Sequence, residues 1–234
     1  MSLRSAGDGR APDRIRVAAV LLAAGQSRRL GGIDKRLLRL DGVPLVRRWF
    51  DVFQAAGIRD VVVVLGHDPE PVRRALHDVD ARIVVNPDHR HGQQTSVLAG
   101  LAALPEGVDA VLVVLVDLVL VRAPELLALI QGWAHRPAGV AALIPFHADR
   151  RGNPVIIDAR VTAEVLEAHV GSSAPGDEPG GLRAWLKAHP DRVGRFESPH
   201  DHFTVDIDTP EDLERIGHRL GRPLDLPKRE EPDP

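Results

Sequence analysis

Five short runs rich in apolar residues, separated by helical patterns, constrain the fold of this chain most. The runs comprise Val17–Leu22, Val61–Leu65, Arg82–Val85, Ala110–Val116 and Val140–Ile144. The helical patterns comprise Pro44–Ala56, Pro69–Leu76, Thr95–Leu104 and Pro124–Trp133. Strands that alternate with helices predict an α/β fold in which the strands pair in parallel through right-handed crossovers. The first run contains no polar residue, which is typical of a strand buried on both faces.

After Pro145 the pattern is less regular. Strands are predicted at Asn153–Ile157, Val193–Phe196 and Phe203–Val205, and helices at Val161–His169 and Gly181–Ala188. A last helix begins after Thr209, an N-cap residue, with Pro210 in its first position. We interpret this half as a substrate-binding elaboration on the same sheet. The expected fold is a Rossmann-like three-layer α/β sandwich with a mostly parallel sheet and a mixed C-terminal part.

The length of 234 residues fits a single domain with a sizeable core, which we place at residues 15–222. The first 14 residues are polar and rich in glycine and arginine, and they predict a disordered leader. Residues 223–234 end in a stretch rich in proline and charge, and they predict a disordered tail.

The composition excludes several classes of function. A hydrophobic content of 44% and a charged content of 27% are ordinary for a globular protein. The net charge of −3 argues against a nucleic-acid partner. No apolar run reaches the length of a membrane span, and the N-terminus lacks the apolar core of a signal peptide. The absence of cysteine excludes disulfides, thiolate metal sites and a cysteine nucleophile, and it agrees with a cytoplasmic location.

The segment after the first strand has the composition of a phosphate-binding loop. It reads Leu22-Ala-Ala-Gly-Gln-Ser-Arg-Arg-Leu-Gly-Gly-Ile-Asp-Lys35. A loop of small residues brings backbone N–H groups against phosphate oxygens, and Arg28, Arg29 and Lys35 supply positive charge. The segment is neither a P-loop nor a dinucleotide-binding turn, which argues against a Rossmann dehydrogenase. It predicts a bound nucleoside triphosphate, and the alternative is a solvated loop before a basic helix.

Two groups of carboxylates predict a metal site. Asp117 directly follows a buried strand, and the carboxyl ends of strands are where open α/β sheets bind ligands. Asp206 and Asp208 lie on the same face if their segment is extended. One or two carboxylates suffice for Mg²⁺ that is bound to a triphosphate. The alternatives are a turn or helix-cap role for Asp117 and a cap for the last helix at Asp208.

These motifs resemble those of the molybdenum cofactor cytidylyltransferases and guanylyltransferases, the MobA-like NTP transferases. The residues that match the first motif are Leu22, Ala23, Ala24, Gly25, Ser27, Arg28, Arg29, Gly31 and Lys35. The segment 206–212 matches the Asp-Ile-Asp-Thr-Pro-Glu-Asp motif of the family. Asp117 matches the aspartate of its Asp-x-Pro element, whereas Val119 stands where the proline is usual. This departure puts the stiffness of the loop in doubt.

Two further segments resemble the family's substrate-binding loops. Residues 86–96 are similar to the loop that contacts the base and ribose, and His89 and His91 within it are interpreted as surface residues, not zinc ligands. The turn at 152–154 is similar to one that meets the acceptor. The segment that ends at Arg183 matches only loosely an arginine-containing motif of the cytidylyltransferases.

The resemblance implies a nucleotide-diphospho-sugar transferase-like fold and a Mg²⁺-dependent transfer of NMP from an NTP to a phosphorylated acceptor, with release of pyrophosphate. Ala24 favours CTP over GTP, and the acceptor that the resemblance implies is molybdopterin, with a molybdoenzyme or its chaperone as protein partner. The predicted catalytic residues are Arg28, Lys35 and Asp117. The predicted nucleotide-binding residues are Leu22, Ala23, Ala24, Gly25, Ser27, Arg28, Lys35, Asn86, Gln93 and Ser96. The acceptor-binding residues are Gly152, Asn153 and Pro154, and the metal ligands are Asp117, Asp206 and Asp208. The alternatives are a different phosphorylated acceptor and a catalytically weak nucleotide-binding regulatory module.

Overall fold

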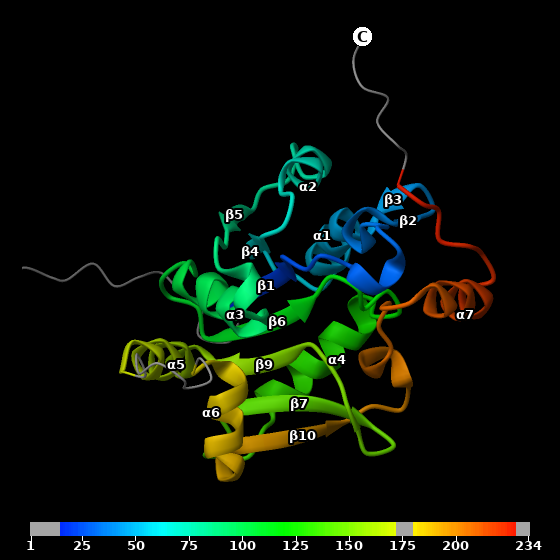
Figure 1. The fold of residues 1–234 in the computed structure, drawn as a ribbon. Coiled ribbons are helices and arrows are strands. Elements are labelled where there is room, and N and C mark those ends of the chain that lie inside the picture. The colour runs from blue at the N-terminus through cyan, green and yellow to red at the C-terminus, as the bar shows by residue number, and fades with distance from the viewer. Residues whose placement is uncertain (1–14, 172–179, 228–234) are drawn as a thin grey trace, which may run out of the picture.

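A computed structural model describes residues 15–171 and 180–227 (Figure 1). The leader predicted at 1–14 lies outside the described residues, as does the end of the predicted tail, 228–234. Residues 223–227 of that tail are described and pack against the domain. Leu224 is buried, and the backbones of Asp225 and Arg39 exchange two hydrogen bonds, of 2.8 and 2.9 Å.

The central sheet has the strand order β10-β7-β9-β6-β1-β4-β5, with β8 paired to β7. The strands are β1 Val17–Ala23, β4 Asp60–Leu65, β5 Arg82–Val85, β6 Ala110–Leu115, β7 Ala142–His147, β8 Arg150–Arg151, β9 Val155–Asp158 and β10 Val193–Glu197. The strand β1 lies between β4 and β6 and pairs with both in parallel, so that Val20 stands opposite Val62 and Val113. All seven residues of β1 are buried, which confirms the strand predicted from its apolar sequence.

The C-terminal part joins the same sheet and makes it mixed, as predicted. The strand β9 lies between β6 and β7 and is antiparallel to both, while β10 extends the sheet parallel to β7. The strand predicted at Phe203–Val205 is wrong. A short 3₁₀ helix, Asp201–Thr204, takes most of that segment, and its turn is closed by a 3.0 Å hydrogen bond from the Thr204 hydroxyl to the Asp201 carbonyl.

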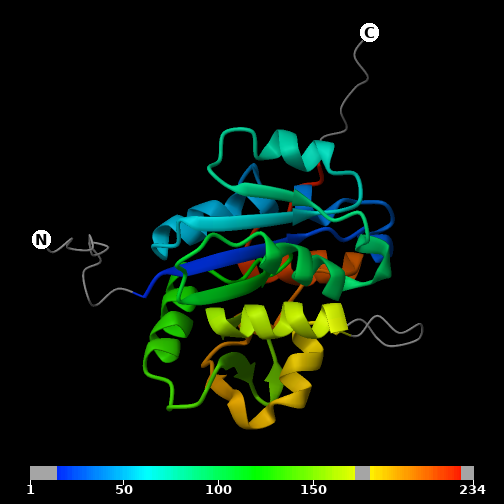
Figure 2. The same ribbon diagram turned by 90° about the vertical axis from the view of Figure 1, so that its left-hand side faces the viewer.

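Helices cover both faces of the sheet and complete the three layers (Figures 1 and 2). On one face lie α1 Leu45–Ala55, α2 Glu70–Ala75 and α4 Ala123–Ala134, and on the other lie α3 Gln93–Ala102, α5 Ala159–Gly171 and α6 Leu182–Ala188. Alternate residues of β1 pack into the two helix layers, because successive side chains of a strand point to opposite faces. None of the helices in the described ranges combines the length and apolar character of a membrane span.

A third apolar cluster supports the region where the predicted functional residues meet. It joins the hairpin β2 Arg39–Leu40 and β3 Val43–Pro44 to the last helix, α7 Pro210–Leu220. Thr209 caps α7 and Pro210 opens it, as predicted. The loop after β6 and the segment before α7 both contribute buried residues, Val119 and Ile207. This cluster therefore holds the loop of Asp117 beside the segment of Asp208.

Candidate nucleotide and metal site

Ser27 and Gly31 give the loop after β1 its shape. Both have left-handed backbone conformations, with φ of 49° at Ser27 and 63° at Gly31, and they bracket a short 3₁₀ turn. The Ser27 hydroxyl accepts a 3.1 Å hydrogen bond from the backbone N–H of Lys35. Ser27 thereby fixes where the second half of the loop begins, and with it the side chain of Lys35.

Arg36 is the structural anchor of this loop, and the sequence motifs did not identify it. Its side chain is only 2% exposed. The guanidinium donates to the carbonyls of Ala23, His67 and Asp68 at 2.7–3.1 Å and to both carboxylate oxygens of Asp34. These bonds join the ends of β1 and β4 to the loop. The one feature of the sequence that could have indicated this role is Asp34, an acidic residue two positions before Arg36 and so able to pair with it.

Replacing Arg36 is expected to destabilise the fold. Arg36→Met leaves the buried Ala23 carbonyl, the partly buried His67 and Asp68 carbonyls and the Asp34 carboxylate without the guanidinium, at a cost of about 3–5 kcal/mol. Urea unfolding of the variant measures this loss, with Arg29→Met as the control because Arg29 is largely exposed. A loss below about 1 kcal/mol would contradict the anchoring role.

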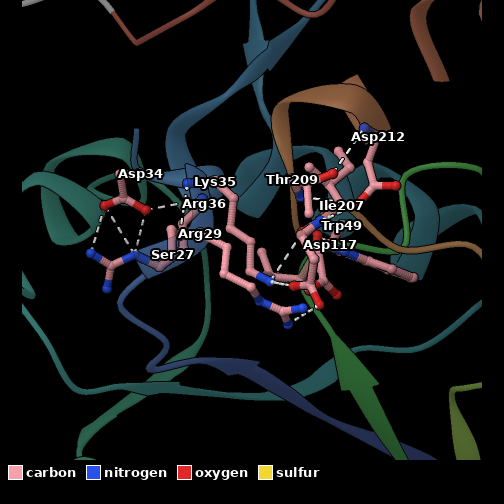
Figure 3. Close-up of polar contacts among 12 residues, drawn as sticks. Ser27, Arg29, Asp34, Lys35, Arg36, Trp49, Asp117, Ile207, Thr209 and Asp212 are labelled. Carbon is pink, nitrogen blue, oxygen red and sulfur yellow. Dashed lines mark hydrogen bonds and ion pairs between the residues drawn. The ribbon is translucent and has the colours of Figure 1, made fainter. Parts of the chain in front are cut away.

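Lys35 lies at the centre of a charge cluster that joins three separate segments (Figure 3). Its ammonium group contacts the Asp117 carboxylate and donates to Asp208 Oδ1 at 3.0 Å and to the Ile207 carbonyl at 3.2 Å. Arg29 binds the other oxygen of Asp208. Two of the predicted metal ligands are thus neutralised by cationic side chains of the loop after β1.

Burial and charge act against each other within this cluster. Burial raises the pKa of the Asp117 carboxyl above its ordinary value, although Lys35 lowers it. Burial lowers the pKa of Lys35, but Asp117 and Asp208 outweigh it and raise this pKa above its ordinary value. The ammonium group of Lys35 therefore keeps its charge, which offsets part of the cost of burying the Asp117 carboxylate.

The three predicted metal ligands can hold one cation. Asp117, Asp206 and Asp208 each offer a carboxylate oxygen within 4.8 Å of the others. Asp117 Oδ1 is buried and has no hydrogen-bond partner among the described residues. Because a buried carboxylate oxygen without a partner is costly, this atom fits a cation ligand. Helix α7 is capped by Thr209, so the cap alternative for Asp208 is wrong.

The loop of Asp117 is stiffened without the usual proline. The N–H of Val119, which a proline lacks, donates to the Asp117 carbonyl at 3.0 Å. From α1, Trp49 Nε1 donates to the Val116 carbonyl at 3.1 Å and Arg48 to the Val121 carbonyl at 3.0 Å. Side chains of α1 therefore hold both ends of the loop, so the departure at Val119 leaves the position of Asp117 supported.

Two adjoining cavities open beside the cluster. The first, of 180 Å³, is lined by Leu22, Ala24, Gly25, Lys35, Arg36, His89, Gln93, Ser96, Leu115, Val116 and Asp117. The second, of 330 Å³, is lined by Ala24, Gly25, Gln26, Ser27, Arg28, Arg29, Lys35, His89, Arg90, Gly92 and Asp208. The two share four residues, so they form one continuous site with an apolar end and a cationic end. Arg28 lies at the cationic end, hydrogen-bonded to Gln26.

Within the loop of residues 86–96, Asn86 lies away from the two cavities and His89 lies beside them. Asn86 is buried, and its amide binds Thr95 Oγ1, Ser96 Oγ and the Asp88 N–H at 2.9–3.0 Å. Its side chain therefore shapes the loop and does not line either cavity. His89, expected at the surface, lines both cavities. Its ring packs so closely on Gly66 that a Cβ there would lie 2.6 Å from the His89 Cβ. The sequence carried no signal for this close approach.

The predicted acceptor residues lie apart from these cavities. The N–H of Asn153 donates to the Phe203 carbonyl at 2.8 Å, and Gly152 is packed so tightly that a Cβ would lie 2.4 Å from the same oxygen. Neither Gly152, Asn153 nor Pro154 is among the residues that line the two cavities. Their role in acceptor binding stays a prediction.

Comparison with known proteins agrees with this geometry. A profile of the MobA-like NTP transferase domain matches residues 19–193. The chain belongs to this family and is an enzyme of the nucleotidyltransferase type. It is 34% identical over 208 residues to the nicotine blue oxidoreductase of Paenarthrobacter nicotinovorans, an alignment that covers 86% of this chain and 96% of the relative.

Three solved structures, of two proteins, share the fold. A nucleotidyl transferase from Methanothermobacter has a TM-score of 0.69 at 24% identity, over 88% of this chain and 98% of that chain. Rv0371c from Mycobacterium tuberculosis has a TM-score of 0.66 at 24% identity, over 86% and 97%. A manganese complex of Rv0371c matches with a TM-score of 0.61 at 22% identity, over 86% of this chain and 97% of that chain. At these identities the likeness shows the fold. The acidic cluster of Asp117, Asp206 and Asp208 is the feature of this chain itself that fits a divalent metal.

Proposed function

We propose that the chain transfers a nucleoside monophosphate from a triphosphate, preferably CTP, to a phosphorylated acceptor, with Mg²⁺ as the metal and molybdopterin as the acceptor to test first. The observation that carries this proposal is the contact of Lys35 with Asp117 and Asp208, which line the two cavities. It joins a predicted phosphate-binding lysine to two predicted metal ligands. A protein partner, a molybdoenzyme or its chaperone, is part of the same proposal.

In this reaction the phosphate of the acceptor attacks the α-phosphorus and pyrophosphate leaves. An acceptor phosphate is already ionised near neutral pH, so no strong general base is needed. Lys35 and Arg28 bind and orient the triphosphate in the cationic cavity and offset the charge that develops on it. Asp117, Asp206 and Asp208 would hold Mg²⁺, which when bound supplies further positive charge to the phosphates.

Those of the remaining predicted residues that line the apolar cavity bind the nucleotide in this proposal. Leu22, Ala24 and Gly25 border the apolar cavity at the end of β1, and Gln93 and Ser96 border it from α3. Gly152, Asn153 and Pro154 would meet the acceptor. Ser27 contributes by positioning Lys35.

Pyrophosphate release with Mg²⁺, measured for CTP, GTP, ATP and UTP with molybdopterin present, tests the proposal. Release from CTP with formation of the cytidylated acceptor supports it. Binding without release for all four would favour a different acceptor or a regulatory binding module. If none of the four triphosphates bound, the proposed function would be wrong.

A second candidate, a redox activity, is favoured by the similarity to a protein named nicotine blue oxidoreductase over nearly its whole length. Oxidation of NADH or NADPH, followed by absorbance in the presence of a quinoid dye as electron acceptor, tests it. Turnover there without pyrophosphate release would favour this candidate over nucleotidyl transfer.

A further inference from the structure

A third cavity, of 480 Å³, lies against Val119 and Leu120 in the loop that follows β6. Of the described residues, none lines both this cavity and the two at the metal cluster. The loop therefore borders two separate sites, because Asp117 lines the first cavity. Four arginines line the third cavity, from α1, the N-cap of α4 and the end of α7: Arg48, Arg122, Arg219 and Arg222.

Arg48 lacks a carboxylate partner in this arginine-lined cavity. Its partly buried guanidinium donates a 3.0 Å hydrogen bond to the Val121 carbonyl, and it makes no ion pair with any described residue. Burial lowers the pKa of Arg48, and the positive charges of Arg122 and Arg222 lower this pKa further. A cation that is partly buried among like charges is stabilised by an anion, and the protein does not place one beside Arg48.

The carboxylates around the cavity offset the other arginines only weakly. Asp41 and Asp51, which also line the cavity, are exposed. Asp41 pairs with Arg222 at 2.8 Å, and both side chains are at least half exposed. Arg122 is 65% exposed and lies 3.5 Å from Glu125. Because exposed ion pairs contribute little free energy, Arg122 and Arg222 can turn toward an anionic ligand at small cost.

The size and lining of the cavity indicate the kind of ligand. Arg219 is held by Asp201 through two hydrogen bonds of 2.7 and 2.8 Å, which leaves three arginines for a ligand. Guanidinium groups bind phosphate oxygens through paired hydrogen bonds. The volume is in the range of small-molecule sites and exceeds that of one phosphate ion. Apolar side chains line another part of the cavity: Leu40, Val43, Val119, Leu120 and Leu220.

We propose that this cavity binds a phosphorylated organic molecule, at a site separate from the nucleotide and metal site. Arg48, Arg122 and Arg222 bind the phosphate, and the apolar side chains contact the organic part. The inference does not rest on the proposed function. Two sources share this chemistry: the phosphorylated acceptor of the proposed reaction, and a regulatory metabolite that acts on the loop of Asp117.

Isothermal titration calorimetry of the full chain with phenyl phosphate, a phosphate on an apolar ring, tests the proposal. We expect a dissociation constant of about 0.1–1 mM, weakened at least about tenfold in Arg48→Met. Arg47→Met is the matched control, because this neighbouring arginine of α1 is paired with Asp78 and does not line the cavity. It should keep the affinity of the wild type. Arg28→Met, altered at the cationic end of the nucleotide site, should keep the binding that depends on Arg48.

Three results would overturn the inference. They are equal binding by Arg48→Met and the wild type, loss of binding in Arg28→Met alone, and no binding by the wild type at about 10 mM phenyl phosphate. The second would place the phosphate in the nucleotide site and leave the proposed function standing. Should Arg48→Met not fold, the double variant Arg122→Met, Arg222→Met decides, because both side chains are at least half exposed. It should bind at least about tenfold more weakly, and unchanged binding would overturn the inference.

The dependence of pyrophosphate release on acceptor concentration distinguishes the two sources. A higher KM for the acceptor in Arg48→Met, with kcat unchanged, assigns the cavity to the acceptor. An unchanged KM in a variant that no longer binds phenyl phosphate assigns it to a regulatory metabolite. If no triphosphate reacts, the proposed function fails, and the titration with phenyl phosphate still decides this inference.

Discussion

Asp117→Asn is expected to lower the rate of pyrophosphate release by about 10²–10³-fold while leaving the protein folded. Asp117 is the most buried of the three clustered carboxylates, and its Oδ1 has no other partner among the described residues. An amide of the same shape keeps the packing of the loop but removes the negative charge that would hold a cation. The loss should therefore appear in the rate and not in the structure.

Thermal unfolding separates the two effects. Burial disfavours the charged form of Asp117, so a neutral amide relieves that cost, while Lys35 keeps Asp208 and the Ile207 carbonyl as partners. We expect the midpoint of unfolding to change by only a few degrees. Asp41→Asn, which removes an exposed carboxylate paired with Arg222, is the matched control and should leave the rate unchanged. A variant of Asp117 that keeps a tenth or more of the rate would contradict its role as a metal ligand.

The parts of the fold that the sequence predicts are those that depend on the pattern of neighbouring residues along the chain. The apolar strand β1 and the parallel pairs that it makes follow from uninterrupted apolar runs and short helical connections. The position of β9 does not follow, because the alternation of strands and helices predicts parallel neighbours and does not place a later strand antiparallel between β6 and β7. The apolar Phe203 predicts a strand, but a short 3₁₀ turn buries this side chain instead.

The functional residues of the site also differ in whether the local sequence predicts them. The carboxylates are predictable from local pattern: Asp117 directly follows a buried strand, and Asp206 and Asp208 lie on the same face of an extended segment. The roles of Arg36 and His89 are not, because both depend on backbone that the fold brings from β4 and its loop: the His67 and Asp68 carbonyls around Arg36, and Gly66 beneath the ring. A basic residue beside Lys35 and a histidine in a polar loop look like solvated side chains until that backbone is in place.

Lys35→Met is expected to strengthen the binding of a divalent cation while it lowers the rate of pyrophosphate release. In the structure, Lys35 and Arg29 neutralise Asp117 and Asp208, the carboxylates that would take a divalent cation. Entry of a cation with two positive charges would release both side chains to the triphosphate, so the cluster keeps its charge balance when the substrate binds. Removing the Lys35 ammonium leaves the carboxylates uncompensated, and like charges that share a site favour a cation between them.

We therefore expect Lys35→Met to bind Mn²⁺ without nucleotide about tenfold more tightly than the wild type, and to lose about 10²–10³-fold in pyrophosphate release. Titration followed by electron paramagnetic resonance measures the free Mn²⁺ directly. Arg29→Met should change Mn²⁺ binding less, because the Arg29 side chain is 70% exposed and that of Lys35 is 14% exposed, and solvent screens the outer pair. Lys187→Met, an exposed lysine on α6, is the control. An unchanged or weaker affinity for Mn²⁺ in Lys35→Met would mean that the ammonium does not occupy the cation position, and that the pairing with Asp117 serves the fold alone.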